Sequence, residues 1–586
     1  MDKINELDYL KNKGENNIKL IYKVEKRGKY KLFGDKFVEN NQNNIKLYVN
    51  GFRIYLNKEY DLEKGDNIII MNIINPIKNL ENMFYNCNHI SNIDELINLD
   101  TQYCNNFSNM FYGCSSLNNI QFLEKWNVSN GKDFSYMFYG CFSLSDISSL
   151  GKWNVSNGNN FSYMFYNCSS LKKISLEKWN VSKGNNFSYM FNECSSLSDI
   201  SSLEKWDVSK GNNFSYMFNE CSSLSDISSL EKWDVSNSNN FSHMFYGCSS
   251  IKNISSLEKW DVSNSNNSTS MFYYCNSLKE IFLENWNVSK GNNFSYMFYN
   301  CSSLKKISLE NWNISNDFQI NTCPSSSDFI LTPYNFSYMF YGCQSLSDIK
   351  SLEKWNTSNG NNFSHMFYHC SSLSNISSLE KWNVSNGKDF SYMFSHCSSL
   401  SNISSLEKWN VSNSNNFSYM FNGCSSIKNI SSLNKWNVSK CNNFSNMFDE
   451  CLSLSDISSL ENWNVLNGNN FSFMFCYCPS LSDIKSLKNW NVSKGNDFSS
   501  MFSYSSSLSD ISSLENWNVS NGNNFAHMFR GCSSLKDISF LEKWNVSKGN
   551  NFTSMFYGCS SLKSIKILKK WNISKSLFKS LLSDIL

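Results

Sequence analysis

The chain has 586 residues and a net charge of +2, with 52 Lys and Arg against 50 Asp and Glu. This near balance excludes the strongly basic surface typical of nucleic-acid-binding proteins, so we expect no nucleic-acid partner. No apolar run of about 18 residues occurs, which argues against membrane insertion. The first residues also lack the apolar segment of a secretory signal, so we expect a cytoplasmic location, with unconventional export as the alternative.

The first 78 residues differ from the rest of the chain. Residues 1–17 are polar and predict a flexible N-terminus, and residues 18–78 predict a small β-rich domain. Asn50-Gly51 predicts a type I′ hairpin turn, because both central residues of that turn need positive φ. We expect the domain to cap the first repeat, with a β-grasp-like topology; a separate binding module is the alternative. Its strands are predicted at 18–24, 29–33, 45–49, 53–56 and 68–74.

From residue 79 to residue 575, one sequence unit returns about 18 times at a spacing of 26 or 27 residues. Residues 160–181 contain Leu171-x-x-Ile174-x-Leu176-x-x-Trp179, the spacing of a leucine-rich repeat with Trp in place of Asn or Cys. The pattern predicts a repeat solenoid of leucine-rich-repeat type, built from short parallel strands and short helical turns. Residues 576–586 predict a C-terminal cap.

Each unit can be divided further by its pattern. The spacing of Phe161, Met164 and Phe165 predicts one helical turn, and residues 171–176 and 179–181 predict short strands. Units of 27 residues carry one more residue after the Ile, as in Ile147-Ser-Ser-Leu150. One extra residue reverses side-chain direction in a strand, so we expect a bulge or a strand break there.

Large apolar residues recur at fixed positions and predict a stacked core rather than a cofactor site. Of the 21 cysteines, 17 share one repeat position, where one unit carries Ser505 instead. A position that accepts serine holds a small buried side chain, so we expect reduced thiols. The predicted core ladder includes Trp153, Trp179, Cys141, Cys168, Met137, Met164, Phe138 and Phe165.

Surface binding is predicted at variable positions beside the Met-Phe pair, where tyrosine recurs, and in an insertion at about 317–334. Tyrosine is favoured at recognition surfaces, and insertions in repeat proteins often lie on binding faces. The alternatives are that the rings pack between neighbouring coils and that the insertion is a tolerated surface loop. The candidate interaction surface comprises Tyr136, Tyr163, Tyr189, Tyr216, His243, Tyr296, Tyr338, His365, Tyr392, Tyr419, Asp317, Phe318, Phe329 and Tyr334.

No catalytic, cofactor or metal site is predicted, because catalysis needs a unique constellation and the sequence is repetitive. His243, His365 and His527 replace tyrosine at one repeat position. His369 and His396 should stack, but the neighbouring thiols are expected to point inward, which argues against zinc. Glu-Lys pairs before Trp predict a solvated ladder in which diagonal opposite charges offset like-charge stacking.

The repeated blocks resemble a known family. Phe138-Tyr-Gly-Cys141-Phe-Ser-Leu144-Ser-Asp-Ile147, followed by Trp153-Asn-Val-Ser156, is similar to the BspA-like leucine-rich-repeat family, and the likeness extends over residues 79–575. The resemblance implies a non-enzymatic protein-interaction scaffold or adhesin-like binder with a protein partner, a role often found at cell surfaces. A glycan ligand is left open. The alternative is a purely structural rod or spacer without a ligand face.

Overall fold

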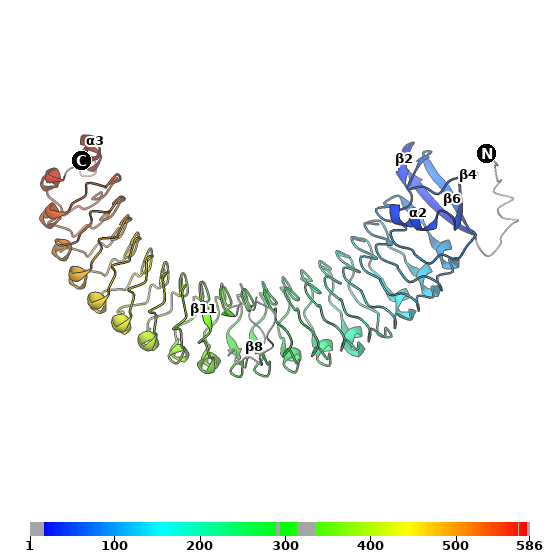
Figure 1. Ribbon diagram of the computed structural model, residues 1–586, viewed down its shortest axis with the longest axis horizontal. Helices are drawn as coiled ribbons and strands as arrows, with labels where there is room; N and C mark the ends of the chain where they lie inside the picture. The colour runs from blue at the N-terminus through cyan, green and yellow to red at the C-terminus, as the bar shows by residue number, and fades with distance from the viewer. Residues whose placement is uncertain (1–16, 289–292, 313–333, 572, 583–586) are drawn as a thin grey trace, which may run out of the picture. The chain divides into compact units, whose positions relative to one another are not determined.

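The computed structural model describes residues 17–288, 293–312, 334–571 and 573–582 (Figure 1). Residues 1–16, the greater part of the predicted flexible N-terminus, lie outside the described residues. The chain divides into two compact units, Met1–Leu278 and Lys279–Leu586. The first contains a β domain followed by repeats, and the second contains repeats followed by helix α3 (Lys575–Leu582). Among the described residues, every helix is too short or too polar to cross a membrane.

The β domain of the first unit contains a five-stranded sheet with the order β4-β3-β6-β1-β7. All of its strand pairs are antiparallel. Asn50 and Gly51 have φ values of 47° and 85°, the positive values that a type I′ hairpin turn requires. The strands are β1 (Asn17–Val24), β3 (Ile45–Val49), β4 (Phe52–Ile54), β6 (Gly65–Ile73) and β7 (Ile90–Asn92).

Two elements of the β domain are absent from the sequence prediction. Helix α2 (Asp35–Asn41) has only 7 residues, too few to show a helical period. Strand β5 (Glu59–Leu62) pairs with β2 (Gly28–Lys31) in a separate two-stranded sheet. A β-grasp-like topology places the first and last strands in parallel, whereas β1 and β6 are antiparallel. That part of the prediction is therefore wrong.

The β domain contacts the first repeat directly. Strand β7 belongs to that repeat and pairs with β1. The backbone amide of Gly34 donates to the carbonyl of Met83 at 3.3 Å, and Asn41 Nδ2 donates to the carbonyl of Asn79 at 3.1 Å. A Cβ at Gly34 would lie 2.1 Å from the Asn82 carbonyl oxygen, so only glycine allows this approach. The predicted capping role stays a prediction that agrees with these contacts.

The run from Phe161 to Cys168 does not form the predicted helical turn. The backbone amides of Phe161, Tyr163 and Phe165 each donate to a carbonyl of the next coil at 2.9 Å. The amides of Met164, Tyr166 and Cys168 instead donate to the carbonyl three residues back. Tyr163 has φ 59°, and a residue with positive φ precedes every described Met-Phe pair of the repeats. Each run is thus a series of tight turns whose alternate amides join it to the next coil.

Strand pairing between coils lies mainly at a different place from the predicted one. Parallel bridges join Asn106 to Asp133 and Asp133 to Asn160, immediately before the Phe of the run. Residues 179–181 form no strand, so that prediction is wrong. The predicted strand at 171–176 is reduced to a bridge between Lys173 and Asp199. Strands of the second unit are β8 (Glu280–Phe282) with β9 (Lys306–Ser308), and β10 (Tyr334–Asn335) with β11 (Gly360–Asn362).

The added residue of the longer units forms a 3-10 helix, so of the two predicted outcomes the strand break is found and the bulge is not. In one such unit, the amide of Leu150 donates to the Ile147 carbonyl at 3.0 Å. The short units at Ile174, Ile281 and Ile307 have no 3-10 helix in their described residues, so one residue switches the local structure. The 3-10 helices are Asp94–Asn98, Gln121–Lys125, Ser148–Lys152, Ser201–Lys205, Ser228–Leu230, Ser255–Leu257, Lys350–Lys354, Ser377–Leu379, Ser404–Lys408, Ser431–Lys435, Ser458–Asn462, Lys485–Asn489, Ser512–Leu514, Ser539–Lys543 and Lys566–Lys570.

The core of each coil is apolar but is also hydrogen-bonded to the preceding coil. The indole Nε1 of Trp153 donates to the Leu123 carbonyl at 2.8 Å. The thiol of Cys141 donates to the Phe111 carbonyl at 3.3 Å, and all described cysteines are buried and free. These carbonyls also accept a backbone amide of their own coil, Trp126 to Leu123 and Cys114 to Phe111, so the indole and the thiol add a second hydrogen bond that joins two coils. The predicted ladder residues Trp153, Trp179, Cys141, Cys168, Met137, Met164, Phe138 and Phe165 are at most 3% exposed.

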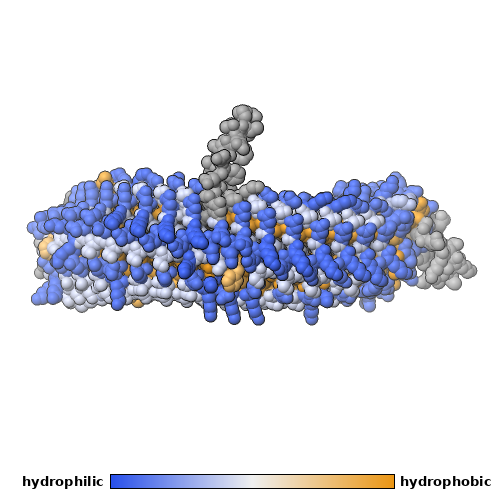
Figure 2. Space-filling view, turned by 90° about the horizontal axis from the view of Figure 1, so that it is seen from below, coloured by the Kyte–Doolittle hydropathy of each residue, from blue (hydrophilic) through white to orange (hydrophobic). Residues whose placement is uncertain are grey.

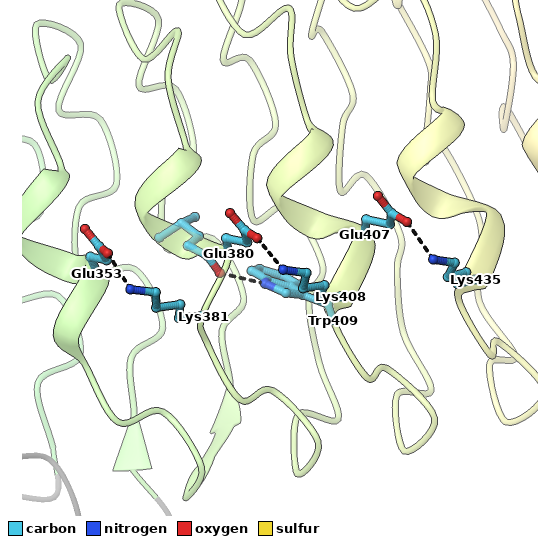
Figure 3. A network of polar contacts seen from close by, with 8 residues as sticks. Glu353, Glu380, Lys381, Glu407, Lys408, Trp409 and Lys435 are labelled. Carbon is cyan, nitrogen blue, oxygen red and sulfur yellow. Dashed lines mark hydrogen bonds and ion pairs between the residues drawn. The ribbon is translucent and has the colours of Figure 1, made fainter.

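The Glu-Lys pairs form diagonal ion pairs between coils, as Figure 3 shows in the second unit. Lys408 Nζ lies 2.6 Å from Glu380 Oε1, and Lys435 Nζ lies 2.7 Å from Glu407 Oε1. These side chains are exposed, so each pair contributes little to stability. The molecular face shown in Figure 2 is mostly hydrophilic, and its hydrophobic side chains do not gather into one broad patch.

Candidate functional site

Rings at the position before each Met-Phe pair stack from coil to coil. We call this stack the first ring column. In the first unit, neighbouring centroids lie 4.3 Å apart with planes within 7°. In the second unit the separations are 4.2–4.5 Å. The members are Tyr136, Tyr163, Tyr189, Tyr216 and His243 in the first unit, and Tyr296, Tyr338, His365, Tyr392 and Tyr419 in the second.

The backbone conformation of this position is unusual for an aromatic residue. Tyr163 has φ 59°, in the left-handed region that costs a non-glycine residue roughly 1–2 kcal/mol. Stacked aromatic pairs contribute about 0.5–1.5 kcal/mol beyond their buried area, which offsets much of this cost. Asn82 and Asn109 adopt the same conformation, with φ 62° and 56°. Asparagine tolerates this region well, so its recurrence here was the sequence signal for a turn instead of a helix.

A second ring column runs beside the first, three residues further along each coil. In the first unit Tyr112, Tyr139 and Tyr166 stack at 4.3 and 4.4 Å. In the second unit Tyr299, Tyr341 and Tyr368 stack at 4.3 and 4.4 Å. The columns touch, because the rings of Tyr163 and Tyr166 lie 5.9 Å apart in a tilted arrangement. Together they form an aromatic surface over these coils of each unit.

The stacking decides which atoms of these rings a ligand can reach. Each ring inside a column has both faces covered by its neighbours, so only the ring edges and hydroxyl groups remain accessible to a ligand. Burial, with the neighbouring Tyr189, raises the pKa of Tyr163 to about 12, so its hydroxyl stays protonated at neutral pH. The surface therefore offers rows of neutral hydrogen-bonding groups on a rigid apolar support. Few ring faces are free for a ligand to stack on.

The histidines of the first ring column behave as ring substitutes. His365 lies between Tyr338 and Tyr392, at 4.2 and 4.3 Å. Burial lowers the pKa of His365 to about 4, so it is neutral at pH 7. His369 and His396 stand 6.0 Å apart, edge to face. The described residues include no cluster of three or more metal-ligating side chains.

Acidic residues that no sequence motif indicates adjoin the second ring column of the first unit. Glu193 and Glu220 occupy the position immediately before the ladder cysteine in consecutive coils. The hydroxyl of Tyr166 donates to Glu193 Oε1 at 2.6 Å, and Asn192 Nδ2 lies 3.3 Å from the same oxygen. Burial and the nearby Glu193 raise the pKa of Glu220. Other coils often carry glycine at this position, so the two acids do not form a recurring motif.

The second unit carries a different polar group in the same columns. Asp449 follows Asn422 in the second column, and its Oδ2 accepts a hydrogen bond from Asn422 Nδ2 at 3.3 Å. Burial, with the neighbouring Glu450, raises the pKa of Asp449 to about 7. Asp449 therefore changes charge near neutral pH.

The predicted insertion contributes no described side chain to the surface. Asp317, Phe318 and Phe329 lie outside the described residues. Tyr334 is the first residue of β10. The ring columns are consequently the part of the predicted interaction surface that the structure brings together.

Comparisons with known proteins identify the repeats. The family model described as Mycoplasma protein of unknown function, DUF285, matches residues 78–202, 146–255, 170–282, 226–328, 334–430, 401–513 and 480–581. A search of curated proteins finds no match.

The solved structures that match include two whose alignments each cover 70% of this chain. One is the functional domain of InlJ from Listeria monocytogenes, described as including a cysteine ladder. It is 10% identical, with 81% of its own chain covered and a TM-score of 0.18. The other is a TDR receptor, 13% identical, with 67% of its chain covered and a TM-score of 0.16. At TM-scores this low, neither structure carries an argument about this protein.

Proposed function

We propose that this chain, which belongs to the family described as Mycoplasma protein of unknown function, DUF285, is a non-enzymatic protein-interaction scaffold. The observation that carries the proposal is the pair of ring columns, in which half-buried tyrosines recur coil after coil. An extended, ordered aromatic surface suits contact with another macromolecule better than it suits the chemistry of a small substrate.

The energetics of such a surface favour protein binding. Tyrosine combines a large apolar ring with a hydroxyl group, and it is enriched among residues that dominate interface energies. Here neighbouring rings already hold one another, as in the stack of Tyr163 on Tyr189 at 4.3 Å. Binding therefore immobilises few new rotamers, and its entropic cost is reduced.

A finer assignment is also proposed. We place the chain in the BspA-like leucine-rich-repeat branch and expect an adhesin-like binder with a protein partner and no cofactor. The support is the repeated Phe-x-x-Cys block, whose Phe138 and Cys141 are both buried in the stacked core. A glycan ligand is left open, although the stacked rings expose few faces to a sugar.

The test replaces Tyr136, Tyr163 and Tyr189 together by Asn. Asparagine preserves the backbone, because the chain already has it at this position with positive φ. The matched control changes Lys178 and Lys205 to Gln; both side chains are exposed and lie outside the ring columns. Each variant is compared with the parent protein for affinity toward any partner recovered by pull-down. We expect the Tyr→Asn variant to lose the partner and the control to keep it.

The alternative function is a structural rod or spacer without a specific ligand face. It predicts that the Tyr→Asn variant folds and retains every partner at the parent affinity. That result would show that the ring columns are not the binding interface.

A further inference from the structure

The second ring column of the first unit is interrupted for two coils. Tyr166 precedes the gap and Tyr246 follows it, while Asn192 and Asn219 occupy the positions between. Asn192 is buried and Asn219 is half-buried. The first ring column continues alongside, with Tyr189 stacked on Tyr216 at 4.3 Å. The second ring column is thus broken at a place where the neighbouring first ring column continues.

Two carboxylates border the gap without a basic partner. Glu193 and Glu220 occupy the neighbouring position in successive coils, and neither forms an ion pair among the described residues of the first unit. The carboxyl carbon of Glu220 would lie 2.7 Å from a Cβ at Gly247, so glycine makes room for this carboxylate. Like charges on adjacent coils are unfavourable when nothing compensates them. A cation bound between them would relieve this repulsion.

A buried amide beside the carboxylates adds an unused hydrogen-bond acceptor. Asn192 is 2% exposed, and its Oδ1 has no hydrogen-bond partner. Its Nδ2 donates to Glu193 Oε1 at 3.3 Å, so the amide adjoins the first carboxylate while Oδ1 stays unpaired. A buried acceptor without a partner is costly, and an N–H donor from a ligand would satisfy it.

The chain itself shows which cation these columns accommodate. In the second unit, Arg530 occupies the second-column position, and its guanidinium carbon lies 5.7 Å from the Tyr504 ring and 5.3 Å from the Tyr557 ring. A guanidinium is planar, stacks on aromatic rings and carries several N–H donors in a fixed geometry. In the first unit Tyr166 and Tyr246 border the gap in the same column, and Glu193 and Glu220 hold the position that Tyr504 holds beside Arg530.

We propose that the gap formed by Tyr166, Asn192, Glu193, Asn219, Glu220 and Tyr246 binds an arginine side chain from a basic segment of a partner protein. The assignment rests on the proposed function, since it gives one subsite and the partner chemistry for the tyrosine surface. Charge complementarity excludes an acidic peptide or a nucleic acid as the occupant. Arginine is favoured over lysine, because only its guanidinium donates in pairs to a carboxylate while stacking on a ring.

The test measures binding of a fluorescein-labelled peptide with two arginines separated by glycines, by fluorescence anisotropy at low salt. A peptide with citrulline in place of arginine keeps the shape and removes the charge. The full-length protein is compared with Glu193→Gln/Glu220→Gln and with a charge-matched control, Glu204→Gln/Glu231→Gln. The control removes two exposed acids that pair with Lys232 and Lys259.

We expect the arginine peptide to bind and the citrulline peptide to bind weakly. The Glu193→Gln/Glu220→Gln variant should bind the arginine peptide at least about fivefold more weakly, and the control variant should match the parent. Absence of peptide binding, equal binding of both peptides, or equal losses in both variants would overturn the proposal. Circular dichroism checks folding, and Glu220→Gln alone provides a milder second variant with the same expected direction.

The result is separable from that for the proposed function. If the tyrosine variant loses its partner while the Glu→Gln variant keeps full peptide affinity, the scaffold stands and the arginine subsite fails. If the tyrosine variant keeps every partner while the Glu→Gln variant loses the peptide, the subsite stands and the broader interface fails.

Discussion

The hydroxyl of Ser505 donates a hydrogen bond to the backbone carbonyl of Phe475 over 2.8 Å, in the place that a cysteine thiol takes in the neighbouring coils. Cys478 and Cys532 donate in the same way to Phe448 and Phe502, each at 3.1 Å. The repeat position therefore requires a small buried donor rather than sulfur chemistry. Each donor fastens its coil to the coil before it.

This relationship predicts how the cysteine position tolerates substitution. Cys168 is fully buried and its thiol donates to the Phe138 carbonyl at 3.3 Å. Cys168→Ser keeps the donor, so we expect a loss in unfolding free energy of about 1 kcal/mol or less. Cys168→Val removes the donor and adds a methyl group to a packed site, so we expect about 1–3 kcal/mol. Urea unfolding followed by tryptophan fluorescence measures both. A serine variant as unstable as the valine variant would contradict the donor role.

The positive φ of Tyr163 predicts an order of tolerance that a helical turn would not give. Tyr163→Asn should fold with a loss on the order of 1 kcal/mol, because asparagine accepts φ 59° while the ring stack is lost. Tyr163→Val should lose about 1–2 kcal/mol more, because a β-branched residue is strained there. Thermal unfolding gives the comparison. In a helix the two substitutions would differ little, since their helix propensities are similar.

Burial of His365 predicts a pH dependence of stability. Its pKa falls from 6.5 to about 4 on folding because the ring loses solvent, while Asp389 opposes this weakly. Between these values the unfolded chain binds more protons, so this contribution to stability is present above pH 6.5 and is lost as pH falls through about 4. His365→Tyr restores the usual residue of the column and should flatten the stability profile between pH 6.5 and 4. Unchanged slopes in unfolding experiments across that range would contradict this assignment.

Asp449 predicts a dependence of the opposite sign. Burial and Glu450 raise its pKa from 3.8 to about 7, so the folded state binds more protons between those values. The stability contributed is present below pH 3.8 and is lost as pH rises through 7. Asp449→Asn should therefore stabilise the protein at pH 8, on the order of 1–3 kcal/mol, and change little at pH 4. Asp456→Asn, at an exposed position just before the next 3-10 helix, serves as the control. If both substitutions change the unfolding free energy equally at pH 8, burial of the Asp449 carboxylate does not cause the effect.

Much of the architecture follows from the sequence because repetition amplifies weak signals. The stacked core of Trp153 and Cys141 is predictable from recurrence alone, and so are the diagonal Glu-Lys pairs. The hairpin at Asn50-Gly51 is predictable from its turn chemistry. These features depend on side-chain type and spacing, which the sequence states directly.

Backbone conformation within each unit was harder to predict. Phe161, Met164 and Phe165 have a spacing that suits a helix and equally suits tight turns that place three side chains inward. The evidence for turns lay in asparagine at the variable position, as at Asn82, and in glycine before the ladder cysteine. One extra serine near Ser149 makes a 3-10 helix instead of a bulge, because Leu150 can bond to Ile147 within its own coil. The half-buried Glu193 and the exposed Glu220 belong to different repeats, and only the stacking of the coils brings them together.

The most direct test of the tyrosine surface is photo-crosslinking from the two sides of one coil. A photoreactive phenylalanine analogue replaces Tyr163 in one preparation and Lys178 in the other, and each is irradiated with the partner obtained by pull-down. We expect a crosslink from position 163, in the first ring column, and none from position 178. Crosslinking from position 178 alone, or equally from both, would contradict the claim that the ring columns are the binding surface.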